Sequence, residues 1–205
     1  MTTFILLRHG ENDYYKKSRM AGRLPGVHLN ARGRQQAEAL AERLAPIPIK
    51  AIYSSPLERA LETAAPLAER LGLPVSPRSG LIETDVGEWQ GQSLKRLRRL
   101  KVWQLLQHSP SLFRFPGGET LVDGQQRIVN EIEALRQLHP GDETVVCVGH
   151  SDPIKHLLAY YLGMPLDLFQ RLTVSTGSFS ILQIGENVRL LALNCDPSQE
   201  LPKFG

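Results

Sequence analysis

At 205 residues, with 41% hydrophobic and 22% charged residues, the chain has the length and composition of a single globular domain. Such a chain can bury a full core without disulfides or structural metals, and two cysteines are too few for a disulfide framework. A formal net charge of +3 fits an anionic small ligand but selects no class of partner by itself. We expect one domain over residues 1–195 and a loose tail over 196–205.

The apolar run at the start of the chain covers only residues 4–7. It is too short for a signal peptide or a membrane span, and no later run reaches ~18 apolar residues. We therefore expect a cytoplasmic protein without contact to a membrane. A reduced, buried thiol is then the favoured state of Cys147, which lies inside the apolar run 145–148.

Predicted strands and helices alternate through the first part of the chain. Residues 4–7 form a continuous apolar run before Arg-His-Gly, which is typical of a buried parallel strand. A helix with one apolar face follows Asn30, its predicted N-cap, and residues 51–54 predict the next strand. Ser55-Pro56 then predicts a helix start, with serine as N-cap and proline at the first helical position.

The helix after Pro56 is expected to run toward Gly72, although Pro66 inside it predicts a kink or a break. Periodicity and turn residues predict the later elements. These are helices over 92–108 and 120–138 with a loop over 109–118 between them, a strand over 143–149, a helix from Ser151 to near Gly163, and an antiparallel hairpin of strands 178–184 and 188–193.

Strands that alternate with helices predict an α/β fold: a three-layer α/β/α domain with a mainly parallel central sheet. Ligands of such sheets bind at the carboxyl ends of the strands. Three polar motifs follow predicted strands in this sequence: Arg8-His9-Gly10, Ser54-Ser55-Pro56 and Gly149-His150-Ser151. We therefore expect the three motifs to meet at one edge of the sheet.

The tripeptide Arg8-His9-Gly10 carries the most specific chemistry. A neutral imidazole can attack phosphorus and form a covalent phosphohistidine, which divides phosphoryl transfer into two easier displacements. Gly10 permits a tight backbone turn beside the phosphate, and the planar guanidinium of Arg8 offers paired donors to its oxygens. Such a tripeptide occurs by chance in roughly one or two chains per hundred of average composition, so it needs support from other motifs.

Two further strand ends give that support. Arg59 falls in the first turn of the helix after residues 51–54, where free backbone N–H groups and the helix dipole favour an anion. His150 closes the apolar run 145–149 as His9 closes the first strand, and its ring can donate to a phosphoryl oxygen. Alone, these residues are more often a solvated arginine and a structural histidine. Their joint placement favours a phosphate site.

Hydrolysis of a phosphate ester also needs an acid for the leaving oxygen and a base for the attacking water. A carboxylate with a raised pKa can serve both steps. Glu83, Asp85 and Glu88 in the segment 81–91 are the candidates. The residue types alone do not choose among them.

The four motifs together resemble the histidine phosphatase superfamily, also called the phosphoglycerate-mutase-like family. Its pattern has Arg-His-Gly, Ser-Ser-Pro-x-x-Arg-Ala, Glu-x-x-x-Gly-x-Trp-x-Gly and Gly-His-Ser. The chain matches it in order at residues 8–11, 54–60, 83–91 and 149–151, and the resemblance spans about residues 4–195. The segment 21–30 is similar to a bacterial subgroup usually labelled probable phosphomutase.

The resemblance implies a phosphatase of a small phosphorylated metabolite that uses no metal and no cofactor. It implies His9 as the nucleophile and Glu83 as the proton donor. The implied phosphate pocket contains Arg8, Arg59 and His150, and the candidate substrate-binding residues are Arg8, Asn12, Arg59, His150 and Ser151. The family often has threonine at position 12 and asparagine at position 15, where this chain has Asn12 and Tyr15. Asn12 is the candidate substitute for that asparagine.

Two alternatives use the same motifs. A phosphomutase would need the same residues, but such enzymes are usually longer near residues 92–118, which favours hydrolysis here. A non-catalytic binding protein of this fold usually lacks a histidine or arginine of the core set, and none is missing from this sequence. A monomer and a homodimer both remain open.

Nucleic-acid binding is a third alternative, suggested by a segment from position 89 to 118 that contains no acidic residue. Its first basic residues are Lys95, Arg96, Arg98, Arg99 and Lys101. The segment lacks interleaved exposed aromatic residues and the chain is only mildly basic, so we expect no nucleic-acid partner. We expect a basic rim over the pocket mouth; the other interpretation is a solvated helix face with Leu94, Leu97, Leu100 and Trp103 packed inward.

Overall fold

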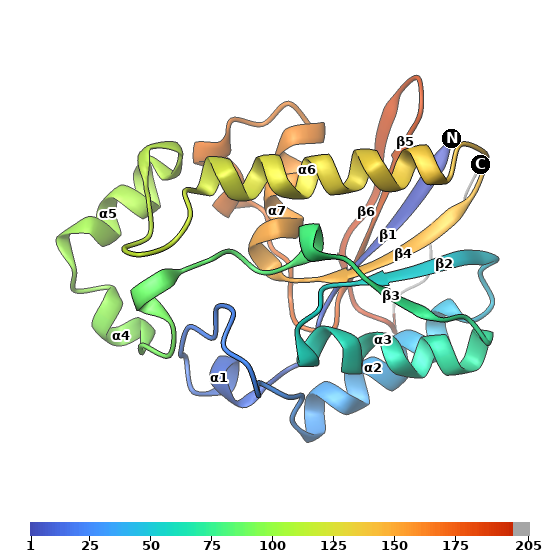
Figure 1. The fold of residues 1–205 in the computed structure, drawn as a ribbon, viewed down its shortest axis with the longest axis horizontal. Helices are drawn as coiled ribbons and strands as arrows, with labels where there is room; N and C mark the ends of the chain where they lie inside the picture. The colour runs from blue at the N-terminus through green and yellow to red at the C-terminus, as the bar shows by residue number, and fades with distance from the viewer. Residues whose placement is uncertain (199–205) are drawn as a thin grey trace.

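A computed structural model describes residues 1–198 as a six-stranded sheet with helices on both faces (Figure 1). The strand order is β3-β2-β4-β1-β5-β6, parallel from β3 to β1 and antiparallel from β1 to β6. The strands are β1 Thr2–Arg8, β2 Ile49–Ser54, β3 Val75–Pro77, β4 Thr144–Gly149, β5 Phe179–Ile184 and β6 Val188–Cys195. The predicted three-layer α/β/α class with a mainly parallel sheet is confirmed.

The helices connect these strands and cover both faces of the sheet. They are α1 Asp13–Lys16, α2 Ala31–Leu44, α3 Glu58–Leu71, α4 Leu94–Leu97, α5 Lys101–His108, α6 Leu121–Leu138 and α7 Ser151–Tyr161, with 3₁₀ turns at Ser79–Leu81, Gly87–Trp89, Pro110–Leu112 and Leu166–Arg171. No helix within residues 1–198 is long and apolar enough to cross a bilayer.

Two apolar cores lie on opposite faces of the sheet, because the side chains of each strand alternate between the faces. One core packs α2 and α3 against Ile5 and Val146, and the other packs α6 and α7 against Leu6 and Cys147. Cys147 is a buried free thiol, as predicted. The central strands β1 and β4 are buried on both faces, which explains their continuous apolar runs.

A third apolar cluster joins α4 and α5 to the first turn of α6. This part of the chain extends to one side of the molecule (Figure 1). Trp89 lies at its centre, stacked on Trp103 and in contact with Phe113 and Phe115. The tryptophan of the predicted motif 83–91 is therefore part of the scaffold that anchors this segment.

Helix α3 departs from the prediction at its start. It begins at Glu58 with Leu57 as N-cap, so Ser55 lies outside the helix; the Ser55 hydroxyl accepts from the Leu57 N–H (3.4 Å) and lies 2.8 Å from Nε2 of His150. The helix continues through Pro66 to Leu71, since residues on both sides of the proline, Ala60 and Leu67 among them, are held in the core. Gly72 ends it in the left-handed conformation.

Three other elements differ from the predictions. The helix predicted over 92–108 is two short helices, because Leu100 is extended (ψ 137°) and interrupts the hydrogen bonding. Strand β3 and helix α1 were not predicted, since three and four residues are too short for a periodic pattern. The predicted tail lies mostly at 199–205, outside the described residues, and the single domain over 1–195 stays a prediction.

His156 on α7 is a buried histidine that gives the fold a pH-dependent stability. Within the described residues neither ring nitrogen has a hydrogen-bond partner, and the ring packs on Phe169 with centroids 4.6 Å apart. Burial lowers the pKa of His156 to about 4. As the pH falls, His156 binds a proton in the unfolded chain before it does so in the folded one. The free energy of unfolding therefore falls by up to about 3 kcal/mol between about pH 6.5 and 4.

We predict that His156→Leu reduces the loss of unfolding free energy between about pH 7 and 4, measured by urea denaturation. His28→Gln is the matched control, because a hydrogen bond to Glu62 raises the pKa of His28. His28 stabilises the fold at low pH, so its removal should increase the loss of unfolding free energy as the pH falls. Identical pH dependence in wild type and His156→Leu would contradict the prediction.

Candidate active site

The parallel pairing of β1 with β4 places the ends of these strands at the same level. Arg8 pairs with Gly149, and the backbone N–H of His9 donates to the carbonyl oxygen of Gly149 (3.0 Å). The rings of His9 and His150 are T-shaped, with centroids 5.1 Å apart. Ser54 ends β2 beside Val148 on the other side of β4. The three predicted motifs therefore meet at one edge of the sheet.

One ring nitrogen of His9 is unprotonated. Nδ1 lies 2.7 Å from the carbonyl oxygen of Gly10, and because a carbonyl can only accept, this contact places the proton on Nδ1. Nε2 is then unprotonated and accepts a hydrogen bond from Nε of Arg59 (3.4 Å). Burial, with the charges of Arg59 and Arg8, lowers the pKa of His9 well below its usual value. The ring is therefore neutral around pH 7.

The backbone around His9 is held by close packing and hydrogen bonds. Gly10 and Gly33 face each other so closely that a Cβ on Gly10 would overlap the backbone of Gly33. The Gly10 N–H donates to the Thr63 hydroxyl (3.0 Å), which itself donates to the carbonyl of Arg59 (2.7 Å). The Gln36 side chain accepts from the Glu11 N–H (2.8 Å). The two glycines allow α2 and α3 to fix the position of the histidine.

A buried arginine, Arg59, and a half-buried one, Arg8, face the histidines. Arg59, in the first turn of α3, is 1% exposed and its Nη2 donates to the carbonyl of Gly22 (2.7 Å). Arg8 Nη1 donates to the carbonyl of Val174 (2.6 Å). Within the described residues Nη1 of Arg59 and Nε of Arg8 are buried without a hydrogen-bond partner. Buried donors usually have partners, so both guanidinium groups retain donors for an anion.

His150 is fully buried between Ser55, Arg59 and Glu83. Its Nε2 lies 2.8 Å from the Ser55 hydroxyl, and its Nδ1 lies 3.8 Å from Oε2 of Glu83. Burial, with the positive charge of Arg59, lowers the pKa of His150 well below its usual value. The Nδ1 atom of His150 also lies 3.4 Å from Nη2 of Arg59, and because an arginine can only donate, this contact places the ring proton on Nε2, which donates to the Ser55 hydroxyl.

Of the three candidate carboxylates, Glu83 lines the cavity and Asp85 and Glu88 do not. Burial and the nearby Asp152 raise the pKa of Glu83 to about 7. Asp85 instead accepts from the Gly87 N–H (3.0 Å) and lies 3.5 Å from Arg23, and Glu88 is exposed. A carboxyl with a pKa near 7 can both donate and accept a proton under physiological conditions.

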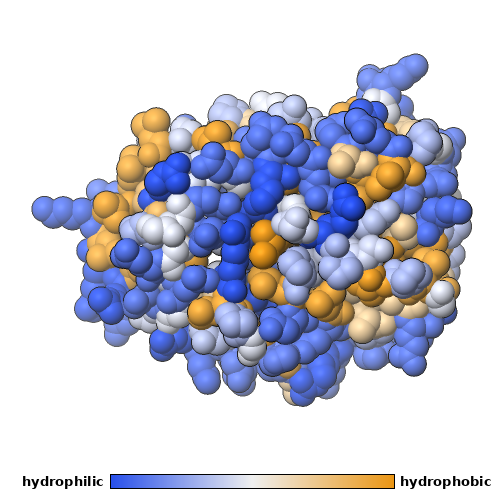
Figure 2. Space-filling view, viewed as in Figure 1, coloured by the Kyte–Doolittle hydropathy of each residue, from blue (hydrophilic) through white to orange (hydrophobic). Residues whose placement is uncertain are grey.

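These groups surround a cavity of about 270 Å³, and Figure 2 shows a hollow bordered by hydrophilic side chains on this face of the molecule. Its lining residues are Arg8, His9, Asn12, Tyr15, Arg19, Met20, Ala21, Gly22, Arg59, Glu83, Thr84, Val86, Leu94, Ser151 and Asp152. Every predicted site residue except His150 is in this lining. His150 lies directly behind it.

Asn12 and Tyr15 occupy the positions where the sequence departs from the family pattern. Asn12 Oδ1 caps α1 by accepting from the Tyr15 N–H (2.9 Å), and the Arg8 guanidinium lies over the Tyr15 ring at 5.1 Å. Ser151 begins α7 beside Val174. The contacts of Ser55, Thr63 and the Gly22 carbonyl could not be predicted from the sequence, because they depend on tertiary proximity.

The basic residues of the predicted rim do not border the cavity. Leu94 lines the cavity, but the five basic residues from Lys95 to Lys101 do not, and all are exposed. Leu97 is buried, as the alternative interpretation of a solvated helix face expects, whereas Leu100, which that interpretation also packs inward, is 38% exposed. Hydrophobic side chains gather over α5 at the left of Figure 2.

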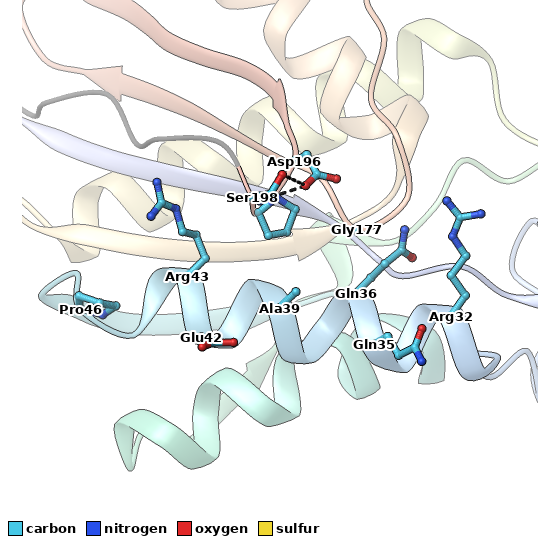
Figure 3. A pocket seen from close by; sticks show the side chains of 11 residues that line it. Arg32, Gln35, Gln36, Ala39, Glu42, Arg43, Pro46, Gly177, Asp196 and Ser198 are labelled. Carbon is cyan, nitrogen blue, oxygen red and sulfur yellow. Dashed lines mark hydrogen bonds between the residues drawn. The ribbon is translucent and has the colours of Figure 1, made fainter.

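A larger cavity of about 630 Å³ lies elsewhere, between α2 and the segment after β6 (Figure 3). Gln36 and Arg43 of α2 line it with Asp196, whose carboxylate accepts hydrogen bonds from Ser198. Its lining contains no histidine. Within residues 1–198 no three His, Cys, Asp or Glu side chains are grouped so that they could hold a metal ion.

A sequence model described as histidine phosphatase superfamily (branch 1) matches residues 4–196. The chain belongs to this superfamily. The match covers all four motifs and joins the two histidines, the two arginines and Glu83 in one family pattern.

Named histidine phosphatases resemble the chain along most of its length. Phosphoserine phosphatase 1 of Hydrogenobacter thermophilus is 31% identical over 91% of this chain and 88% of its own. Glucosyl-3-phosphoglycerate phosphatase of Mycolicibacterium vanbaalenii is 38% identical over 80% of this chain and 75% of its own. A mycobacterial glucosyl-3-phosphoglycerate phosphatase solved with VO3 has a TM-score of 0.86 at 34% identity, over 94% and 98% of the two chains.

We predict that the ring Cε1 protons of His9 and His150 do not titrate in NMR spectra between about pH 5.5 and 8, because their pKa values lie well below 6.5. His28 is the internal control and should titrate with a raised midpoint. A midpoint near 6.5 for either site histidine would show that its ring is not kept neutral by burial and the arginines.

Proposed function

We propose that the protein is a phosphomonoesterase that hydrolyses a small phosphorylated metabolite through a phosphohistidine at His9. The observation that carries this proposal is the unprotonated Nε2 of His9, which faces Arg59 beside a cavity that Arg8 and Glu83 also line. The family and its named phosphatases support hydrolysis.

In the first step His9 Nε2 attacks phosphorus and the bond from phosphorus to the ester oxygen breaks. Glu83 transfers its proton to that oxygen, so the product leaves as an alcohol. The free donors of Arg8 and Arg59 stabilise the negative charge on the three remaining phosphoryl oxygens. The result is a phosphohistidine and an ionised Glu83.

In the second step water attacks the phosphohistidine. Glu83, now a carboxylate, accepts a proton from this water, and the bond from phosphorus to Nε2 breaks. Inorganic phosphate leaves, and His9 is again neutral with its proton on Nδ1. Glu83 returns to its protonated form, so the cycle closes without a net change in the protein.

The substrate is a small phosphate ester, because the cavity of about 270 Å³ must hold the phosphoryl group and the leaving group together. The named relatives act on phosphoserine and glucosyl-3-phosphoglycerate. A phosphate-release screen should therefore include phosphoserine, phosphoglycerates, their glycosides, sugar phosphates and nucleotide-pathway esters. A cytoplasmic location remains part of the proposal.

We predict that His9→Ala abolishes turnover, because His9 is the one histidine among the described residues that line the cavity. Rapid acid-free quenching of wild type with excess substrate should leave a phosphoryl group on His9, identified by peptide mass spectrometry. His28→Ala, which changes an exposed histidine, should retain both turnover and labelling. A trapped phosphoserine or aspartyl phosphate would overturn the assignment.

We predict that Glu83→Gln slows hydrolysis of an alkyl phosphate by roughly 10²–10⁴-fold, since glutamine cannot supply the proton. A nitrophenyl ester should be affected much less because its leaving group needs little protonation. In wild type the alkyl ester rate should fall as pH rises through about 7, the pKa of Glu83, and the variant should lack this decline. If Asp85→Asn or Glu88→Gln gave this pattern instead, the acid would be misassigned.

We predict that exhaustive chelation with EDTA leaves activity intact, because the positive charge at the phosphoryl group comes from Arg8 and Arg59. Vanadate, which imitates five-coordinate phosphorus, should inhibit. Arg59→Met should abolish activity and vanadate binding together. Loss of activity with EDTA and its return with a divalent ion would contradict a metal-independent mechanism.

A further inference from the structure

Two consecutive residues in the loop after α1 contact opposite sides of the site. The carbonyl of Gly22 accepts from Nη2 of Arg59 (2.7 Å). Arg23 Nε donates to the backbone carbonyl of Glu83 (2.7 Å). The loop therefore links the arginine that faces His9 to the residue that supplies the proton.

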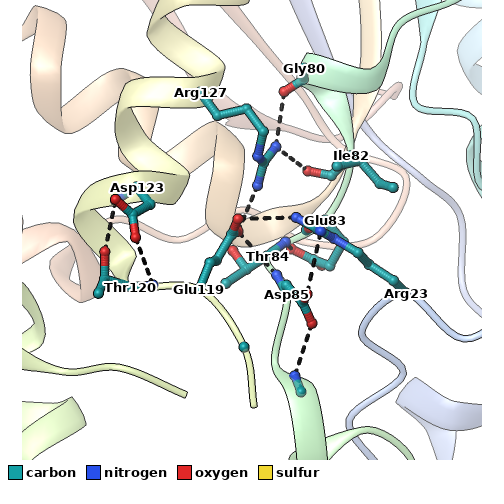
Figure 4. A network of polar contacts seen from close by, with 12 residues as sticks. Arg23, Gly80, Ile82, Glu83, Thr84, Asp85, Glu119, Thr120, Asp123 and Arg127 are labelled. Carbon is teal, nitrogen blue, oxygen red and sulfur yellow. Dashed lines mark hydrogen bonds and ion pairs between the residues drawn. The ribbon is translucent and has the colours of Figure 1, made fainter. Parts of the chain in front are cut away.

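Glu119, in the loop before α6, forms an ion pair with the guanidinium of Arg23. Its Oε2 accepts from Nη2 of Arg23 (3.1 Å), and its Oε1 accepts from Nη2 of Arg127 (2.7 Å) and from the Asp85 N–H (3.0 Å). The Glu119 N–H also donates to the carbonyl of Asp85 (3.1 Å). Figure 4 shows Glu119 between the two arginines, with both pointing toward it.

Arg127 attaches the same segment to α6. Its Nη1 donates to the carbonyls of Gly80 (3.0 Å) and Ile82 (2.8 Å), and its neighbour Ile128 is buried in the core. The backbone on both sides of Glu83 is thus fixed by side chains from a loop and a helix distant in sequence.

The Glu83 side chain has little else to hold it. The one hydrogen bond recorded for its carboxyl within the described residues is to the adjacent Thr84 N–H (2.9 Å), and His150 lies 3.8 Å away. The position of the carboxyl therefore depends on the position of the backbone. Small errors in placing a proton donor are costly, about 10²-fold for 1 Å.

We propose that Arg23 and Glu119 are positioning residues, which hold the Glu83 backbone at the distance from Arg59 that proton transfer to the leaving oxygen requires. This inference rests on the proposed function, because it assumes Glu83 as the acid. Arg23 spans three acceptors, on Glu83, Asp85 and Glu119, with one planar group. Lysine, as a single point charge, cannot reproduce that arrangement.

The test is Arg23→Met, measured on an alkyl phosphate and on a nitrophenyl phosphate in wild-type and Glu83→Gln backgrounds. Arg78→Met is the matched control, because Arg78 also makes a partly buried ion pair to α6, with Glu131 at 2.6 Å, and has no recorded contact with residues 82–85 in the described structure. We expect kcat for the alkyl ester to fall about 10- to 100-fold in Arg23→Met. KM, and kcat for the nitrophenyl ester, should change about threefold or less.

In the Glu83→Gln background, Arg23→Met should lower kcat for the alkyl ester only slightly, because a residue that acts through Glu83 has no acid left to position. Glu119→Gln should show the same dependence on leaving group and background. Arg23→Lys should recover stability without recovering kcat, and it replaces Arg23→Met if thermal unfolding shows that the latter is not folded.

Equal losses on both esters, undiminished losses in the Glu83→Gln background, or losses no larger than those of Arg78→Met would each overturn the inference. Failure of the proposed function gives a different result, because Glu83→Gln would then have no selective effect on the alkyl ester. If Glu83→Gln slows the alkyl ester selectively while Arg23→Met leaves the kinetics unchanged, the positioning role alone is rejected.

Discussion

Parallel pairing of β1 with β4, with Arg8 level with Gly149, is the constraint on which the site depends. Both strands are buried on both faces, so their register is set by core packing rather than by the site itself. A slip of one residue would turn every side chain of a strand to the opposite face. The register therefore places His9 beside His150, and α3, which follows the neighbouring strand, adds Arg59.

Two arginines and two histidines then share a region from which water is largely excluded. Four positive charges would repel one another strongly there, and the site avoids this because burial and the arginines keep both histidines neutral. The arginines remain charged, and a phosphate ester supplies the opposite charge. The same burial keeps Glu83 protonated near neutral pH. One environment thus provides a neutral nucleophile, an anion site and a proton donor.

Most of the fold and the main site residues could be predicted from the sequence, because buried strands and amphipathic helices leave long periodic patterns. His9 and His150 could be placed because each directly follows a predicted strand, and Arg59 because it falls in the first turn of the helix after one. Ser55 could not, since its sequence fits a helix cap equally well and only the fold brings His150 to its hydroxyl. No local sequence pattern pointed to Arg23, because its partners lie 60 and 96 residues away along the chain. Leu100 fits a helical period, but the chain is interrupted there and leaves it exposed.

The central claim is that the phosphoryl group is transferred twice, first to His9 and then to water. Each in-line displacement inverts the configuration at phosphorus, so two displacements restore it. The most direct measurement is hydrolysis of a substrate whose phosphoryl group is chiral through oxygen isotopes and sulfur, followed by analysis of the inorganic thiophosphate. Overall retention of configuration is the predicted result. Inversion would show direct attack by water and would contradict a phosphohistidine intermediate.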